Sequence, residues 1–125
     1  MSHFTTIQTQ IRDPAALRGA CQELGLSLFQ NAQARGYGSN THQGDFVIRL
    51  RGPYDVALTR QQDGSYGMTT DWWGGHVEKE LGAGYGKLLQ LYGVYKAQAE
   101  ARRKGLTTRR QQLGDGSIKL TIGGL

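Results

Sequence analysis

The chain opens with apolar and β-branched residues that alternate with polar ones. In the segment HFTTIQTQI, residues 3–11, every second side chain from Thr5 to Ile11 is Thr or Ile. A period of two places these side chains on one face of an extended segment. The pattern predicts a first strand, with Phe4 or Ile7 near the core.

A helix is predicted directly after this strand. Asp13 provides a capping carboxylate and Pro14 suits the first helical position. Gly25 is suited to end the helix, because glycine adopts the positive φ that helix ends often require. The apolar positions between them recur at helical spacing: Leu17, Ala20, Cys21 and Leu24.

The middle of the chain reads as strands separated by turns. The segment 26–37 predicts a strand, whereas 35–45, RGYGSNTHQGD, has the composition of a loop. The segment 46–60 predicts two strands that are broken at Gly52 and Pro53. Asp63-Gly64 then predicts a tight hairpin turn, since such turns need positive φ. Residues 66–73, YGMTTDWW, would form the returning strand.

The longest regular pattern covers residues 77–104 and predicts one amphipathic helix that Gly105 terminates. Gly82, Gly84, Gly86 and Gly93 each cost about 1 kcal/mol relative to alanine, so the first turns are expected to be irregular or packed closely on another element. The apolar stripe consists of Leu81, Tyr85, Leu88, Tyr92, Tyr95 and Ala99. A second hairpin is predicted over residues 106–122, around the turn Asp115-Gly116. Its Arg-Gln-Gln and Asp-Gly-Ser stretches also occur in the first hairpin, which indicates that both hairpins use the same type of turn.

This order of elements predicts the fold class. Strands cluster instead of alternating with helices, which favours an α+β fold with a mainly antiparallel sheet. We expect two helices packed on one face of the sheet and a C-terminal β-hairpin. A length of 125 residues fits a single domain, residues 1–125.

Cysteine content and hydropathy indicate the cellular compartment, and the charge is unevenly placed along the chain. The lone Cys21 cannot form an intramolecular disulfide, which fits a reducing compartment. No apolar run approaches the roughly 18 residues needed to cross a membrane, and the N-terminus lacks the pattern of a secretory signal. We therefore expect a cytoplasmic protein without membrane contact. The net charge of +5 arises in the last quarter, where residues 96–125 hold seven basic and two acidic side chains.

No catalytic, cofactor-binding or metal-binding constellation is predicted. The GAGYGK stretch, residues 82–87, lacks the glycine and the Ser or Thr that a phosphate loop requires. The three histidines lie at no metal-ligand spacing. Cys21 falls on an apolar helix face, where a core thiol is the expected role. A third, enzymatic hypothesis places a pocket near Asp71, His76 and Glu80, although nothing orients a nucleophile toward the histidine.

The stretch TTDWWGG, residues 69–75, is the strongest candidate for a contact surface. Two adjacent tryptophans should have unequal surroundings, one structural and one free to contact a partner. The predicted partner-binding residues are Trp72, Trp73, Tyr66 and Asp71. Asp71 could also bond a turn amide or an indole N–H.

The basic C-terminal segment supports an alternative, a nucleic-acid-binding module. Its predicted contact residues are Arg102, Arg103, Lys104, Arg109 and Arg110. Aromatic residues such as Tyr37 could serve as stacking platforms for a single strand. Cations at a helix end also complement the helix dipole, and neighbouring residues on a strand point to opposite faces, so a continuous basic groove is not implied.

Several stretches resemble the hypothetical chloroplast reading frame thirty-five family, a domain of unknown function found in cyanobacteria, algal plastids and other bacteria. These stretches span essentially the whole length: MSHFTTIQTQIRD, ARGY, YDVALTR, DGSY, DWWG, YKAQAEARRKG and DGSIKLTI. The resemblance carries no catalytic residues.

The resemblance implies a small accessory protein that depends on a partner, with an AAA-type ATPase or a ferredoxin-like protein as candidates from the family's context. It also implies a stromal location if the gene is plastid-encoded. We therefore expect a protein that acts by protein–protein binding without catalysis. No cofactor is expected, and the oligomeric state is left open.

Overall fold

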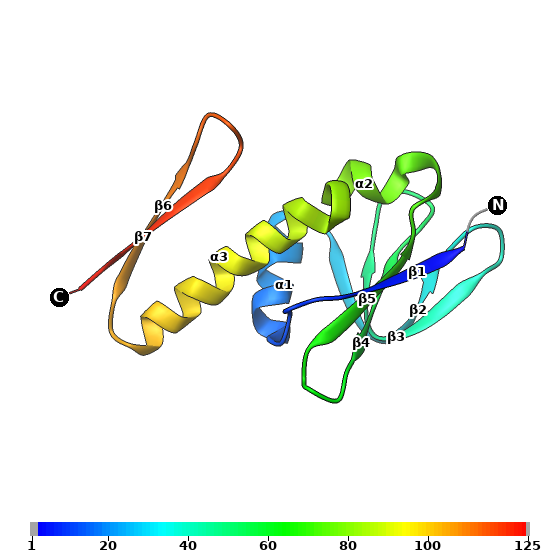
Figure 1. Cartoon of the computed structure of the whole chain (residues 1–125), viewed down its shortest axis with the longest axis horizontal. Helices are drawn as coiled ribbons and strands as arrows, with labels where there is room; N and C mark the ends of the chain where they lie inside the picture. Colours follow the sequence, from blue (N-terminus) through cyan, green and yellow to red (C-terminus); the bar gives the residue numbers. More distant parts are fainter. Residues whose placement is uncertain (1–2, 125) are drawn as a thin grey trace.

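The computed structural model describes residues 3–124 and has the predicted α+β architecture. Five antiparallel strands form one sheet in the order β1-β5-β4-β3-β2, and two further strands form a separate hairpin (Figure 1). The elements are β1 (Phe4–Gln8), α1 (Pro14–Glu23), β2 (Ser27–Arg35), β3 (Thr41–Arg49), β4 (Val56–Arg60), β5 (Tyr66–Asp71), α2 (His76–Leu81), α3 (Gly86–Arg103), β6 (Thr107–Gln112) and β7 (Ile118–Gly123).

The start and end of α1 follow the sequence signals. The Asp13 side chain accepts hydrogen bonds from the backbone N–H groups of Ala15 and Ala16, and Pro14 occupies the first turn. Gly25 has a φ of 73° just beyond the helix. Local residue chemistry therefore fixes both ends of this helix.

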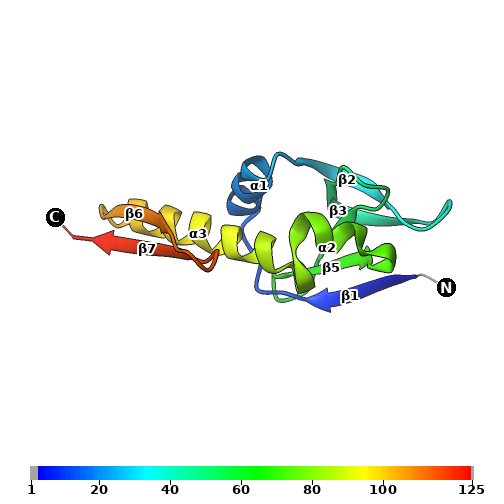
Figure 2. The same ribbon diagram turned by 90° about the horizontal axis from the view of Figure 1, so that it is seen from above.

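Helices cover one face of the sheet, as Figure 2 shows from above. Side chains of α1, α2 and α3 join alternate strand residues in one core cluster. On β3, Phe46 and Ile48 belong to this cluster, whereas Val47 between them packs in a second, smaller cluster with Ala34 and Ala57. The sheet is thus packed on both faces, and every residue of β5 is buried.

The second cluster exists because the β2–β3 hairpin doubles back across the sheet. The ladder between β2 and β3 runs from Ser27 opposite Arg49 to Arg35 opposite Thr41. At the bend, Asn31 has a positive φ of 49°. A Cβ placed on Gly44 would lie 2.6 Å from the Phe46 carbonyl oxygen and 3.0 Å from the Ala57 Cβ. Only glycine permits this close approach.

The prediction of a loop over residues 35–45 was therefore wrong at both ends. The turn covers only the few residues after Arg35, and β3 begins at Thr41. Polar composition suggested a loop, yet these residues are paired in a two-stranded ladder whose outer surface faces solvent. Polar composition indicates exposure to solvent. An exposed strand of a hairpin has the same kinds of residue as a loop, so composition alone does not distinguish the two.

The single long helix predicted over residues 77–104 is also corrected. The segment forms α2 and α3, joined by a short 3₁₀ turn, Ala83–Tyr85. Gly82, Gly84 and Tyr85 all have positive φ, which no continuous helix tolerates. The apolar spacing continues across the break because Leu81 and Tyr85 are both buried in the same core. Gly105, with a φ of 73°, follows α3 as predicted.

The two Asp-Gly hairpins share one turn geometry. In the first, Asp63 accepts bonds from the Ser65 N–H and hydroxyl at 2.9 and 2.6 Å, and Gly64 has a φ of 89°. In the second, Asp115 bonds Ser117 in the same way at 3.0 and 2.6 Å. The repeated letters in the sequence therefore reflect a common turn, as predicted.

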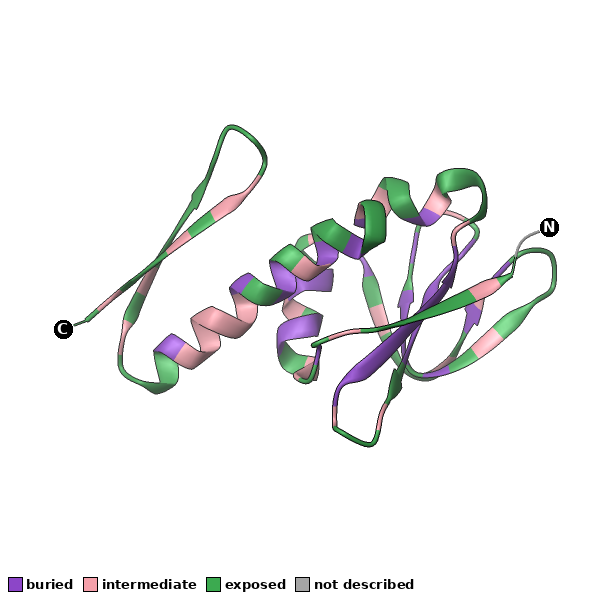
Figure 3. Cartoon of the chain, in the orientation of Figure 1, coloured by how far each residue is buried: buried purple, intermediate pink, exposed green. Residues whose placement is uncertain are grey.

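The C-terminal hairpin lies apart from the five-stranded sheet, beside the C-terminal half of α3 (Figures 1 and 3). Most of its residues are exposed or half-buried. It is held by a contact with α1: Arg110 donates to both carboxylate oxygens of Glu23 at 2.8 and 2.6 Å. Ile118 packs against the main core from the same side.

Candidate functional site

A buried carboxylate anchors the folded-back hairpin. Asp55 is completely buried just before β4. It accepts two hydrogen bonds from the Arg35 guanidinium, Nε and Nη2 each at 2.8 Å, and one from the Arg35 backbone N–H at 2.9 Å. The Leu50 N–H donates at 3.1 Å, and Arg49 Nε lies 3.3 Å away. Such a bidentate pair fixes orientation as well as distance.

The charge of Asp55 is stabilised despite its burial. Burial alone raises the pKa of this carboxyl group, but the hydrogen bonds from Arg35 and Leu50 outweigh it and hold the pKa below its ordinary value. The side-chain hydrogen bonds with Asp55 in turn raise the pKa of Arg35. The pair is therefore ionised at neutral pH, as a buried charge must be paired to persist.

The loop between β3 and β4 is tied down from two sides. Arg35 Nη2 also donates to the carbonyl oxygens of Leu50 and Gly52, each at 3.0 Å. From α2, the Glu80 carboxylate accepts the N–H groups of Arg51 and Gly52, each at 2.9 Å. The segment that holds Pro53 and Tyr54 is thus rigidly placed.

This arrangement brings two exposed aromatic rings together. Tyr37 sits in the turn after Arg35, and Trp73 follows the end of β5. They are 49% and 53% exposed, and their rings meet edge-to-face with centroids 5.6 Å apart. Tyr54 is only 5% exposed, lines the same hollow as Tyr37 and packs edge-to-face on His76 with centroids 5.3 Å apart. We call Tyr37, Tyr54 and Trp73 the aromatic corner.

The two adjacent tryptophans are unequal, as predicted, although neither lies on the strand. Trp72 is half-buried, and its ring lies 4.7 Å from that of Tyr85, inside the core. Trp73 begins a 3₁₀ turn and points to solvent. The inequality arises from a turn at the strand end instead of strand alternation.

The other two predicted contact residues are buried, so they offer a partner almost no surface. Tyr66 is 5% exposed and packs edge-to-face on Phe46 in the core. Asp71 is 1% exposed, and its Oδ1 accepts the Trp73 backbone N–H at 3.0 Å. Asp71 is therefore a positioning group for the turn that presents Trp73.

A hollow of about 430 Å³ opens beside the aromatic corner. Residues 35–41 line one wall, and Pro53 and Tyr54 line the other. Neither Asp71 nor His76 lines this hollow, and Glu80 is already bonded to the backbone. The geometry therefore gives no support to an enzymatic pocket around those three residues.

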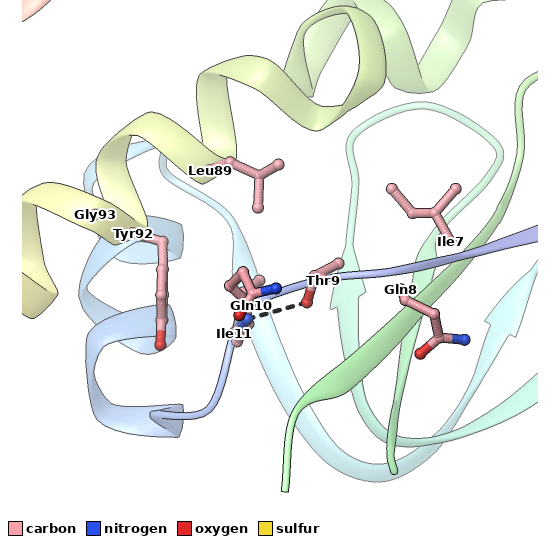
Figure 4. A pocket seen from close by; sticks show the side chains of 8 residues that line it. All are labelled: Ile7, Gln8, Thr9, Gln10, Ile11, Leu89, Tyr92 and Gly93. Carbon is pink, nitrogen blue, oxygen red and sulfur yellow. Dashed lines mark hydrogen bonds between the residues drawn. The ribbon is translucent and has the colours of Figure 1, made fainter. Parts of the chain in front are cut away.

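A second hollow, of about 500 Å³, lies between β1 and α3 (Figure 4). Ile7 and Leu89 border it from the two elements, with Gly93 and Tyr92 further along the helix. Its lining is mainly apolar, and the polar groups are amide and hydroxyl side chains without charge. Nothing in this groove resembles a reactive constellation.

Two of the five predicted basic residues are paired with carboxylates of the chain. Arg110 is bound to Glu23, and Arg103 to Glu100 in the preceding turn of α3. Arg109 neighbours Arg110 on β6 and is exposed. Arg102 and Lys104 lie at the end of α3. Two of the five cations are thus neutralised within the chain.

Three further chemical features can be checked against the described residues. Burial raises the pKa of Cys21 to about 12, so its thiol is protonated at neutral pH and is no nucleophile. Within residues 3–124, no three His, Cys, Asp or Glu side chains are grouped as metal ligands would be. In the same part of the chain, no helix is both long and apolar enough to span a membrane.

Comparison with known proteins assigns the family. Residues 20–121 match the model of the family described as "Protein of unknown function (DUF1257)". The chain belongs to the DUF1257 family. It is also 33% identical over 125 residues to "Uncharacterized protein ycf35" of Pyropia yezoensis. The matched region covers 98% of this chain and 96% of that protein. No solved structure matches the chain.

Within this DUF1257 protein, the residues that sequence reasoning missed are Arg35, Asp55 and Tyr54. Their signals are present but weak. Asp55 stands next to an apolar strand run, VAL, which marks a carboxyl group entering the core. Gly52-Pro53 before Tyr54 marks a fixed turn. Nothing local connects either residue to Arg35, because the contact depends on the bend at Asn31 and Gly44.

Proposed function

We propose that this protein is a non-enzymatic accessory domain that binds another protein through the aromatic corner. The observation that carries the proposal is the exposure of Trp73 and Tyr37, about half of each side chain, in a mutually packed pair. Tryptophan and tyrosine are the residues most enriched at the energetic centres of interfaces.

The frame behind the pair supports this proposal. Trp73 is held by the Asp71 carboxylate, and Tyr37 by a turn in which the Gly36 N–H bonds the Asn40 carbonyl at 2.8 Å. Arg35 and Asp55 fix the base of that turn. A rigid aromatic surface loses little conformational entropy on binding, which favours affinity.

Affinity purification from cells that encode the protein tests the proposal. The chain carries a tag, and Trp73→Ala is compared with wild type and with Phe29→Ala. Phe29 is a matched control, since it is 46% exposed on β2. We expect a specific partner to be retained by wild type and Phe29→Ala and lost with Trp73→Ala. Equal recovery with all three proteins would contradict the proposal.

A further inference from the structure

The hollow beside the aromatic corner has a chemistry of its own. Its walls are the turn after Arg35, including Tyr37 and Asn40, and the fixed segment Pro53 and Tyr54. The Tyr37 ring contacts the Trp73 ring, so the aromatic surface continues from the hollow to Trp73. The result is an aromatic groove bordered by small polar residues.

The lining of the groove holds no unpaired charge. Arg35 is the charged residue in its lining, and the Asp55 carboxylate neutralises that guanidinium through two bonds. An acidic or phosphorylated ligand would need unpaired cations here, and a nucleic-acid strand would need several. A neutral ligand matches the charge of the surface.

The groove also offers hydrogen-bond donors that await acceptors. Within residues 3–124, the Tyr37 hydroxyl, the Trp73 indole N–H and the Asn40 side-chain amide have no hydrogen-bond partner, and all three residues are exposed. Two backbone N–H groups of the turn, those of Gly36 and Asn40, already bond within it. The side-chain donors are therefore the main groups that this place offers to a ligand.

We infer that the partner presents a neutral, proline-containing segment in polyproline II conformation to the aromatic corner. This inference rests on the proposed function and specifies its ligand. Such a segment has no internal hydrogen bonds, so its carbonyl groups accept from side-chain donors, and its proline rings pack on aromatic faces. It is extended before binding, which lowers the entropic cost.

An NMR titration of the full ¹⁵N-labelled chain with a polyproline decapeptide tests the inference, with a Gly-Ser decapeptide of equal length as control. We expect saturable shifts in the amide signals of residues 36–41, 54 and 72–76 with polyproline only. Trp73→Ala and Tyr37→Ala should each weaken binding about tenfold or more, and Phe29→Ala should leave it unchanged.

Shifts that fail to saturate at millimolar peptide, shifts shared with the Gly-Ser peptide, or shifts centred on the β1–α3 groove would overturn the inference. Competition separates the two proposals. If a Trp73-dependent partner is recovered and polyproline does not displace it, the ligand assignment fails and the proposed function stands. If no partner depends on Trp73, the proposed function itself fails.

Discussion

Arg35 donates two hydrogen bonds of 2.8 Å to the fully buried carboxylate of Asp55, across the folded-back β2–β3 hairpin. This pair stands at the base of the turn that holds Tyr37 against Trp73. The stability of the fold and the geometry of the aromatic corner therefore depend on the same two side chains.

Asp55→Ala should destabilise the protein by about 3–5 kcal/mol, because removal of one partner leaves the guanidinium and two backbone N–H groups without their acceptor. Urea denaturation followed by circular dichroism measures the change. Glu78→Ala, on the exposed side of α2, is the control and should shift stability by less than about 0.5 kcal/mol. Equal effects of the two substitutions would show that the Asp55 network contributes little.

Stability should fall in acid. The pKa of Asp55 is lowered in the folded state, so its contribution is complete above the ordinary pKa of about 3.9 and is lost as the pH drops through the folded value. The free energy of unfolding, measured against pH, should decline below about pH 4. In Asp55→Asn this acid-dependent slope should be smaller, although the variant starts from a lower stability. An identical slope in both proteins contradicts this account.

Alanine should have opposite effects on stability at two glycines, one at the bend of the hairpin and one in an open position. Gly44→Ala should cost about 1–3 kcal/mol, since the new Cβ meets the Phe46 carbonyl and Ala57 at the bend. Gly93→Ala should stabilise by about 0.4–1 kcal/mol, because it lies within α3 with open space around it. Thermal unfolding compares the two, and a harmless Gly44→Ala would argue against the folded-back hairpin.

Two buried tyrosines should respond oppositely to loss of the hydroxyl. The Tyr85 hydroxyl is buried and has no partner within the described chain, so Tyr85→Phe should be neutral or stabilising by up to about 1 kcal/mol. The Tyr92 hydroxyl accepts the N–H groups of Arg12 and Asp13 at 3.0 and 3.1 Å. Tyr92→Phe should therefore cost about 1–3 kcal/mol. The denaturant midpoints of the two variants measure these changes. If Tyr85→Phe were the more destabilised of the two, the result would be incompatible with these contacts.

The elements that the sequence predicted correctly are those with local causes. The cap at Asp13 and the turns at Asp63 and Asp115 each act within three residues, so they are readable from the chain. The break between α2 and α3 was missed because its apolar spacing continues through Tyr85. Positive φ at a tyrosine has no reliable pattern in a sequence.

The candidate site depended on contacts that no local pattern reports. The inequality of Trp72 and Trp73 was predicted. Of the two alternatives for Asp71, a turn amide or an indole N–H, the structure shows the turn amide, whose N–H donates to the carboxylate. The approach of Tyr37 to Trp73 was not, since it requires a hairpin bent at Gly44 and anchored on Asp55. Long-range pairing of this kind is decided by the packing of the whole sheet.

Site-specific photocrosslinking in cells that encode the protein tests most directly whether the aromatic corner is the binding surface. A benzophenone amino acid replaces Ser39, an exposed residue that lines the hollow at the aromatic corner, in one variant and the exposed Phe29 in the other. The account predicts a discrete crosslinked protein from position 39 and none from position 29. Crosslinks of equal yield from both positions, or from position 29 alone, would contradict it.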